Sequence, residues 1–356
     1  MEVVRTFHPV GQGAFYSERF YDCRNIHYVV VYDCGTETAE SVLDVSLDEQ
    51  IDLFKGLIDP IKKIDILFIS HFHADHISGI ERLIANVKVD RTVIPMLDYQ
   101  TIMTTRLQNY LRYDQTIARN ADRIIKSLYL DEGKDERFGE VVVVSPDTVG
   151  ELHTMRDGML PRTGRYISSG SVIPLGHLWE YVPYNSIEFS DPRALAIVDG
   201  LKKINGEPLD IEALIRDHLD EVRKVYRKAI GYANDNLYTL VVVSQPVEGI
   251  VPQPIPRLSH CIYFGDYEYK KNSLWDKLRK RYAEIGTVQV PHHGAKGNWK
   301  TEMGDGDPRH YIVSSGSTNG HHHPNFWVLQ EIWDKGHRFF VVSEKETTRR
   351  EYWFYV

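Results

Sequence analysis

The sequence predicts an α/β fold, in which strands alternate with helices along the chain. The apolar runs at 28–32 and 64–69 are typical of buried strands. After His76, apolar residues at Ile80, Leu83 and Ile84 follow the spacing of one helix face. The part of the chain from residue 238 onward alternates strands and helices in the same way.

The predicted strands fall at 28–32, 64–69, 93–95, 141–144, 179–182, 238–243, 261–264, 287–290, 311–313 and 339–342. We expect Asp33-Cys34-Gly35 to be a turn that ends the first of them. Spacing predicts one amphipathic helix over 211–230, with Asp210 as its N-cap, and further helices at 273–283 and 324–335. Pro at the start of the last helix and Gly after its end fit the usual asymmetry of helix termini.

The middle third departs from this alternation. Residues 100–130 and 185–232 are interpreted as helical insertions into a single domain spanning 1–356, where they are positioned to form a lid. The rest of the chain then forms the core fold that carries the site.

Composition excludes several classes of protein. Hydrophobic residues make up 42% and charged residues 26%, which excludes disorder, collagen and coiled coil. No apolar run approaches the roughly 18 residues of a membrane span, and the start lacks a signal-peptide core. Three cysteines make no disulfide framework, so we expect a cytoplasmic protein. A net charge of −8 argues against coating of nucleic acid by bulk charge, although a nuclease with a locally basic groove stays compatible with it.

Three histidines and an aspartate follow the second predicted strand within six residues, as HFHADH at 71–76. Imidazole nitrogens and carboxylate oxygens are ligands that zinc and neighbouring metals prefer. In a loop, His71 and His73 lie two residues apart and point at one metal. Asp75 and His76 follow at the start of a predicted helix, so their side chains can turn toward a second metal ion. A solvated polar loop is the alternative interpretation.

Together with other motifs, HFHADH resembles the signature of the metallo-β-lactamase superfamily. Asp33-Cys34-Gly35 is similar to the turn before that signature, Phe264-Gly265-Asp266 to the strand whose aspartate bridges two metals, and Val290 to Gly294 to a later histidine loop. Val10-Gly11-Gln12-Gly13 and His323-Pro324 narrow the resemblance to the hydrolase domain of ComEC-type competence proteins. The resemblance covers roughly 1–98 and 234–356. It implies a four-layer αββα sandwich.

The same resemblance implies a set of metal ligands: His71, His73, Asp75, His76, Asp266, His292 and His323. Adjacent residues of an extended segment point to opposite sides, so we favour His292 as the ligand and assign His293 to substrate. Asp75 is expected to orient the nucleophile, His293 or His323 to protonate the leaving group, and Asp33 to hold a ligand ring.

One departure from the family pattern concerns the first metal site. A histidine expected shortly before the strand to Asp266 is missing, and Asn234-Asp235-Asn236 stands there instead. Asp235 is the candidate replacement ligand, and Asn236 would be a weaker one. His153 and His177 are weaker candidates, because a lone histidine beside a strand is more often structural.

We therefore expect a hydrolase with two divalent cations, Zn²⁺ or Mn²⁺, in which a hydroxide bridging the metals attacks a phosphodiester. The substrate is a phosphodiester or a nucleic acid, and no membrane or protein partner is indicated. Basic helix faces at 211–230 and 273–283 are candidate phosphate contacts, with Tyr226 and Tyr282 for stacking; ordinary solvated faces are the alternative. The competing functions are hydrolysis of a small ester, lactone or amide on the same metals, and a non-catalytic interaction module.

Overall fold

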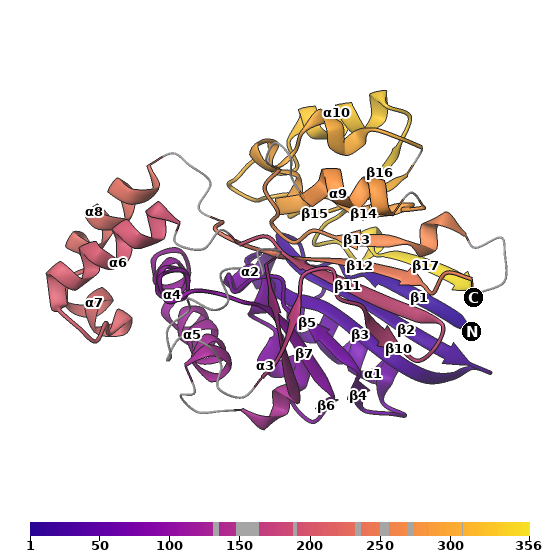
Figure 1. Ribbon diagram of the computed structural model, residues 1–356, viewed down its shortest axis with the longest axis horizontal. Helices are drawn as coiled ribbons and strands as arrows, with labels where there is room; N and C mark the ends of the chain where they lie inside the picture. Colours follow the sequence, from indigo (N-terminus) through magenta and orange to yellow (C-terminus); the bar gives the residue numbers. More distant parts are fainter. Residues whose placement is uncertain are drawn as a thin grey trace.

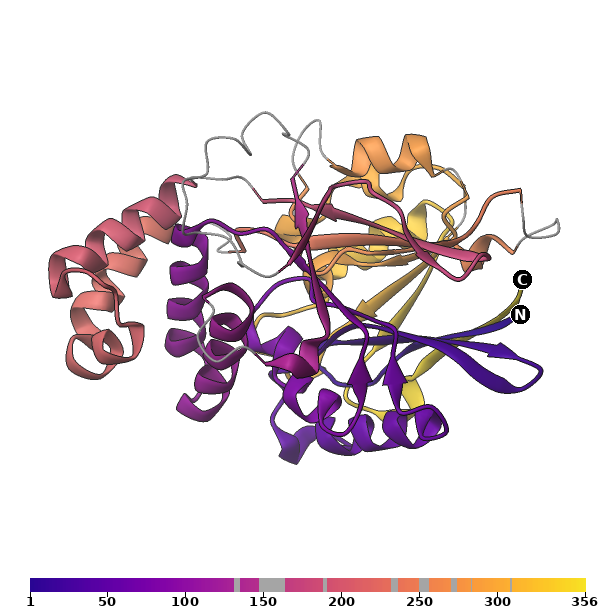
Figure 2. The same ribbon diagram turned by 60° about the horizontal axis from the view of Figure 1, so that its bottom comes forward.

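The computed structural model describes residues 1–130, 135–146, 164–187, 191–231, 236–249, 256–269, 274–282, 284–307 and 309–356. Two β-sheets pack face to face, with helices on both outer sides (Figures 1 and 2). This is the predicted α/β fold, with the layers of a metallo-β-lactamase sandwich. No helix among the described residues combines the length and apolar character that a membrane span needs.

The first sheet has eight described strands in the order β17-β1-β2-β3-β5-β7-β8-β9. Their bounds are Glu2–Phe7 (β1), Gly13–Asp22 (β2), Asn25–Thr36 (β3), Ile66–Phe68 (β5), Arg91–Pro95 (β7), Glu140–Ser145 (β8), Arg165–Ser168 (β9) and Arg350–Tyr355 (β17). β1, β2 and β17 are antiparallel neighbours, so the two ends of the chain lie side by side (Figure 1). Sequence analysis did not identify these three strands.

The second sheet runs β10-β11-β12-β13-β14-β15-β16. Its strands are Ile173–Leu175 (β10), Trp179–Asn185 (β11), Leu240–Pro246 (β12), Cys261–Tyr263 (β13), Thr287–Gln289 (β14), His310–Ser314 (β15) and Arg338–Val342 (β16). A small pair, β4 (Lys63–Ile64) and β6 (Lys88–Val89), forms a two-stranded sheet of its own.

The helices are α1 (Leu47–Ile58), α2 (Ala74–Ile77), α3 (Ile80–Ile84), α4 (Tyr99–Arg112), α5 (Gln115–Tyr129), α6 (Pro192–Asn205), α7 (Ile211–Asp217), α8 (Leu219–Ile230), α9 (Leu274–Arg281) and α10 (Phe326–Asp334). α1, α3 and α5 share one apolar core with the outer face of the first sheet. α9 and α10 share another with the outer face of the second sheet, and a third core fills the space between the sheets.

The helices of the middle third form a lobe beside the sandwich, at the left of Figure 1. Their apolar side chains, from Met103 and Leu107 of α4 to Val222 of α8, make a core of their own. The helical character predicted for 100–130 and 185–232 is therefore confirmed for the described residues. The single-domain organisation and the lid role stay predictions.

Three local predictions were wrong. The helix predicted over 211–230 is two helices that meet at His218, although Asp210 does cap the first. Pro324 precedes the last helix rather than starting it, because Asn325 is the N-cap. The expected turn at Asp33 is a bulge inside β3: Phe15 pairs with Cys34 and Tyr16 with Tyr32, which leaves Asp33 unpaired in the register, and the strand continues to Thr36.

Candidate metal centre

The first three residues of HFHADH lie between the end of β5 and the one-turn helix α2, whose N-cap is His73, and the last three residues are the start of α2. All four candidate ligands in it, His71, His73, Asp75 and His76, are buried. A buried ionisable side chain requires a partner, so the arrangement around each of them decides what it binds.

Asp33 anchors this segment from the neighbouring strand. Its backbone takes the left-handed conformation (φ 55°), which turns the carboxylate toward the loop. There the carboxylate accepts hydrogen bonds from the Ser70 backbone N (2.7 Å), the Ser70 hydroxyl (2.6 Å) and His76 Nδ1 (2.7 Å). These are the contacts that the predicted orienting role requires.

Asp266 lies at the centre of the site. Gly265 before it has φ 55°, and a Cβ there would lie 2.4 Å from the hydroxyl of Thr239, so only glycine fits this turn. Asp266 Oδ1 lies 3.3 Å from His76 Nε2, whereas Oδ2 lies 3.5 Å from His71 Nε2. The two carboxylate oxygens thus face different histidines, as a bridging ligand must.

Two groups of buried ligand atoms meet at Asp266. One consists of Asp75, His76, Asp266 and His293, and the other of His71, His73 and Asp266, with the atoms of each group within 4.8 Å of one another. His71 Nε2, His76 Nε2 and Asp266 Oδ1 have no hydrogen-bond partner among the described residues. Buried polar atoms without partners are costly, whereas divalent cations would satisfy all three, so the residues present fit a two-metal centre.

The rings of three histidines are held by oxygen atoms on their Nδ1 side. His71 Nδ1 contacts the Ser70 hydroxyl (2.9 Å), His76 Nδ1 the Asp33 carboxylate, and His293 Nδ1 the Ser314 carbonyl (2.8 Å). When Nδ1 donates to oxygen, Nε2 keeps the lone pair that a metal needs. In all three residues that nitrogen is directed toward Asp266 or Asp75.

The two adjacent histidines 292 and 293 both line the cavity, and only His293 belongs to one of the two groups of ligand atoms. Both residues have positive φ angles, 47° and 53°, in a tight turn after β14, so the alternation of an extended segment does not apply. His293 Nε2 lies 3.2 Å from Asp75 Oδ2, and His292 Nε2 lies 3.7 Å from Asp266 Oδ2. Geometry therefore favours His293 as the metal ligand, where sequence analysis favoured His292.

His323 and Asp235 are placed differently from the other candidates. His323 lines the cavity and its ring lies 5.6 Å from that of His292, but it belongs to neither group of ligand atoms. Burial and the neighbouring His292 lower the pKa of His323 to about 3, so its ring is neutral near pH 7. Asp235 and His153 lie outside the described residues, and His177 is exposed on the loop between β10 and β11.

Charges within the centre are strongly coupled. Burial raises the pKa of Asp75 and of Asp266, but the surrounding histidines outweigh it and hold both below their ordinary values. Burial lowers the pKa of His76, but Asp75, Asp266 and Asp33 raise it well above its usual range. Burial and the charge of His76 lower the pKa of His71 to about 3. Without metal, the centre is a network of carboxylates and imidazolium.

A cavity of about 480 Å³ opens over these residues. Besides the ligands it is lined by Gln12 and His321, and by groups that sequence analysis did not identify: Glu37, Arg112, Tyr113, Ala295 and Asn298. Gln12 belongs to the Val10–Gly13 motif between β1 and β2, so this motif lies at the site. The Tyr113 hydroxyl donates to Asp75 Oδ1 at 3.2 Å, and His321 Nε2 pairs with Glu37 at 3.3 Å.

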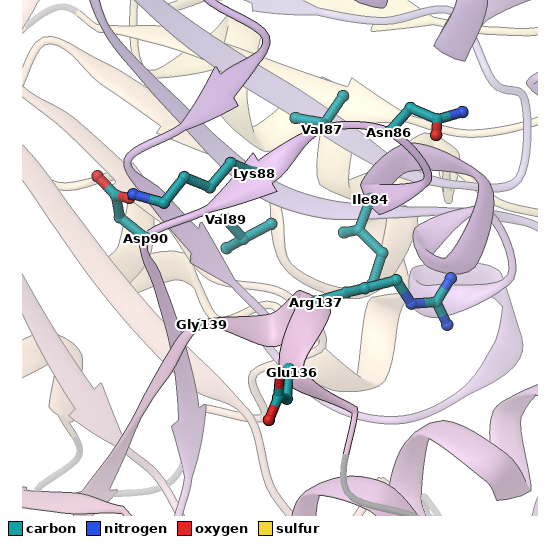
Figure 3. A pocket seen from close by; sticks show the side chains of 9 residues that line it. All are labelled: Ile84, Asn86, Val87, Lys88, Val89, Asp90, Glu136, Arg137 and Gly139. Carbon is teal, nitrogen blue, oxygen red and sulfur yellow. The ribbon is translucent and has the colours of Figure 1, made fainter.

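A second cavity, of about 590 Å³, lies between β6 and the segment 136–139 (Figure 3). Ile84 and Val89 line it, and the Lys88 ammonium turns to the Asp90 carboxylate at 2.6 Å. Neither group of candidate metal ligands includes its residues.

The predicted stacking residues differ in their exposure. Tyr282 is buried and its hydroxyl bonds that of Tyr184 at 2.9 Å, so stacking on a base is excluded for it. Tyr226 is half-buried and its hydroxyl contacts Gln108 of α4. On α8, Arg223, Lys224, Arg227 and Lys228 are exposed.

Comparison with known proteins finds a family model that matches part of the chain. Residues 27–155 match the family model "Metallo-beta-lactamase superfamily". The chain is 29% identical over 131 residues to cleavage and polyadenylation specificity factor subunit 3 of Dictyostelium discoideum, and 26% identical over 119 residues to the anti-Pycsar protein Apyc1 of Bacillus phage BSP38. These matches span 36% and 30% of this chain, but only 16% and 41% of the relatives' lengths.

Among solved structures, the metallo-beta-lactamase fold protein YhfI of Bacillus subtilis aligns over 99% of both chains, with 11% identity and a TM-score of 0.39. The matched residues 27–155 contain the HFHADH segment, and the chain around them has the two packed sheets with outer helices. Residues 27–155 of this α/β sandwich thus match the model of the metallo-β-lactamase superfamily.

Proposed function

We propose that the protein is a metal-dependent hydrolase that cleaves phosphodiesters at the centre around Asp266. The observation that carries the proposal is the pair of buried ligand groups sharing one aspartate. Two divalent cations bound there would supply Lewis acidity and lower the pKa of a coordinated water. The charge of a phosphodiester is what such a pair neutralises best.

The chain's own residues would divide the work as follows. His71, His73 and Asp266 would hold one cation, and Asp75, His76, Asp266 and His293 the other. Tyr113 contacts one oxygen of Asp75 and His293 lies beside the other, so both oxygens of this carboxylate have a partner. Arg112 and His323 line the cavity, where they would contact a phosphate oxygen and the leaving group.

Two further facts support a phosphodiester substrate. One relative is named for cleavage and polyadenylation, although the match covers only 16% of it. The Val10–Gly13 and His323-Pro324 motifs, on which the ComEC-type resemblance rests, both lie at the cavity. The exposed arginine and lysine side chains of α8 would contact the phosphates of a nucleic acid.

The test is a substrate panel with purified protein supplied with Zn²⁺ or Mn²⁺. Bis-p-nitrophenyl phosphate and single- and double-stranded DNA are expected to be cleaved, and Asp75→Ala or His73→Ala to abolish cleavage. His27→Ala, at an exposed histidine of β3, is the matched control. Hydrolysis of esters, lactones or amides without phosphodiester cleavage would replace the proposal with the small-molecule alternative. Absence of both metal and activity would favour an interaction module.

A further inference from the structure

Helix α4 of the middle insertion makes three hydrogen-bonding contacts to the HFHADH segment. Asn109 Nδ2 donates to the Phe72 carbonyl at 2.8 Å, and Gln108 Oε1 lies 3.1 Å from His73 Nε2. The Tyr113 hydroxyl, just after the helix, reaches Asp75. Residues 105, 108 and 109 lie on one helix face, and Thr105 also contacts the Tyr238 hydroxyl, which accepts from the Phe72 backbone N.

The contact with Gln108 indicates which ring nitrogen of His73 carries the hydrogen. Gln108 is 1% exposed, and its amide oxygen only accepts, so His73 Nε2 must donate to it. A neutral ring that carries hydrogen on Nε2 has its lone pair on Nδ1. His73 therefore presents Nδ1 to a metal, whereas His71, His76 and His293 present Nε2.

The same amide connects the centre to the helical lobe. Gln108 Nε2 donates to the Tyr226 hydroxyl of α8 at 3.4 Å, so one side chain contacts both His73 and the lobe. An insertion that served only as a lid would need no buried contact with a metal ligand.

We propose that Gln108 is a positioning residue: it fixes His73 for metal binding through Nδ1, and α4 is thereby a structural part of the metal centre. This inference rests on the two-metal centre of the proposed function, but not on the substrate. Residues that orient a metal-bound histidine typically contribute 10–100-fold to metal affinity, and a loss of about that size is expected at the site of His71, His73 and Asp266 when the acceptor is removed.

The experiment is a titration of EDTA-treated, full-length protein with Zn²⁺ against a chromophoric chelator, and with Co²⁺ followed by its visible spectrum. Gln108→Met keeps the side-chain length but removes the acceptor, whereas Gln108→Glu keeps it. Gln330→Met, at an exposed position of α10, is the control. We expect Gln108→Met to weaken one site about 10–100-fold and to change the Co²⁺ spectrum, and Gln108→Glu to restore both.

A double-mutant cycle separates positioning from folding. If Gln108 acts through His73, Gln108→Met costs little further affinity in a His73→Ala background. Wild-type affinity of Gln108→Met at both sites, or an equal loss with and without His73, would overturn the inference. Wild-type protein that binds neither metal would instead overturn the metal centre itself, so the two failures are distinguishable.

Discussion

Replacement of Asp33 by Asn tests how the site holds His76. Asn fills the same volume and tolerates the left-handed backbone at this position, so the bulge of β3 is expected to persist. The amide oxygen can still accept from the Ser70 backbone N. The amide NH₂, however, replaces the oxygen that accepts from both the Ser70 hydroxyl and His76 Nδ1.

The expected consequence is a change of tautomer in His76. Facing an NH₂ donor, Nδ1 of the neutral ring must accept, which places its hydrogen on Nε2, the atom directed at Asp266. To bind a metal through Nε2, the ring must return its hydrogen to Nδ1, where the variant offers no acceptor. The metal-bound variant therefore lacks about one charge-assisted hydrogen bond, worth roughly 1.5–3 kcal/mol. Zn²⁺ affinity at the group of Asp75, His76, Asp266 and His293 should fall about 10–100-fold.

The assay is chelator competition with Zn²⁺, with thermal unfolding of the metal-free protein measured in parallel. Asp65→Asn is the matched control, since Asp65 is also buried and also accepts from a backbone N, that of Val29, but lies away from the site. It should lower stability and leave both metal affinities unchanged. Wild-type affinity of Asp33→Asn at both sites would refute the tautomer reasoning.

Three further predictions concern pH, backbone and core. Zn²⁺ affinity should increase as the pH rises above about 6.5, and binding should release protons. The reason is that the neighbouring carboxylates overcome burial and raise the pKa of His76, which must lose its proton before it can bind the metal. Calorimetry in two buffers measures the proton release, and a pH-independent affinity would contradict the prediction. Gly265→Ala should destabilise the protein by about 1–3 kcal/mol in urea unfolding, because its Cβ would meet a threonine hydroxyl, whereas Gly249→Ala, which has positive φ but open space, should cost less. Glu18→Gln should lower the free energy of unfolding by about 3–5 kcal/mol, since it leaves Arg5 buried with an uncompensated charge, without changing the Zn²⁺ stoichiometry.

Residues that follow a strand directly were predictable from the sequence. HFHADH and Gly265-Asp266 each come after an apolar strand, and these strand ends meet at one edge of the sandwich. Residue type and position relative to the strand therefore carried enough information to bring Asp266 close to His71 and His76.

The backbone at the histidine pair was not predictable in this way. Left-handed conformations at two successive non-glycine residues are costly, and they persist only where tertiary contacts maintain them. Here His292 N donates to the Gly265 carbonyl and His293 Nδ1 contacts Ser314, from two other segments. The residues next to His292 and His293 in the sequence do not reveal these distant partners, so sequence analysis predicted an extended segment. The break at His218 is similar, because neither Gly nor Pro marks it.

Asn236, from the stretch that stands where a histidine is expected, contacts the centre at the bridging candidate Asp266. Its amide Nδ2 donates to Asp266 Oδ2 at 2.7 Å and lies 3.3 Å from His292 Nδ1, so it occupies the side of Asp266 that faces His71. An amide NH₂ has no lone pair for a metal, and it uses one of the lone pairs of the bridging oxygen. Among the described residues, the His71 group therefore offers three ligand atoms against four in the His76 group. Fewer ligands among the described residues and a competing donor favour weaker binding, so we expect the site of His76 and His293 to fill first.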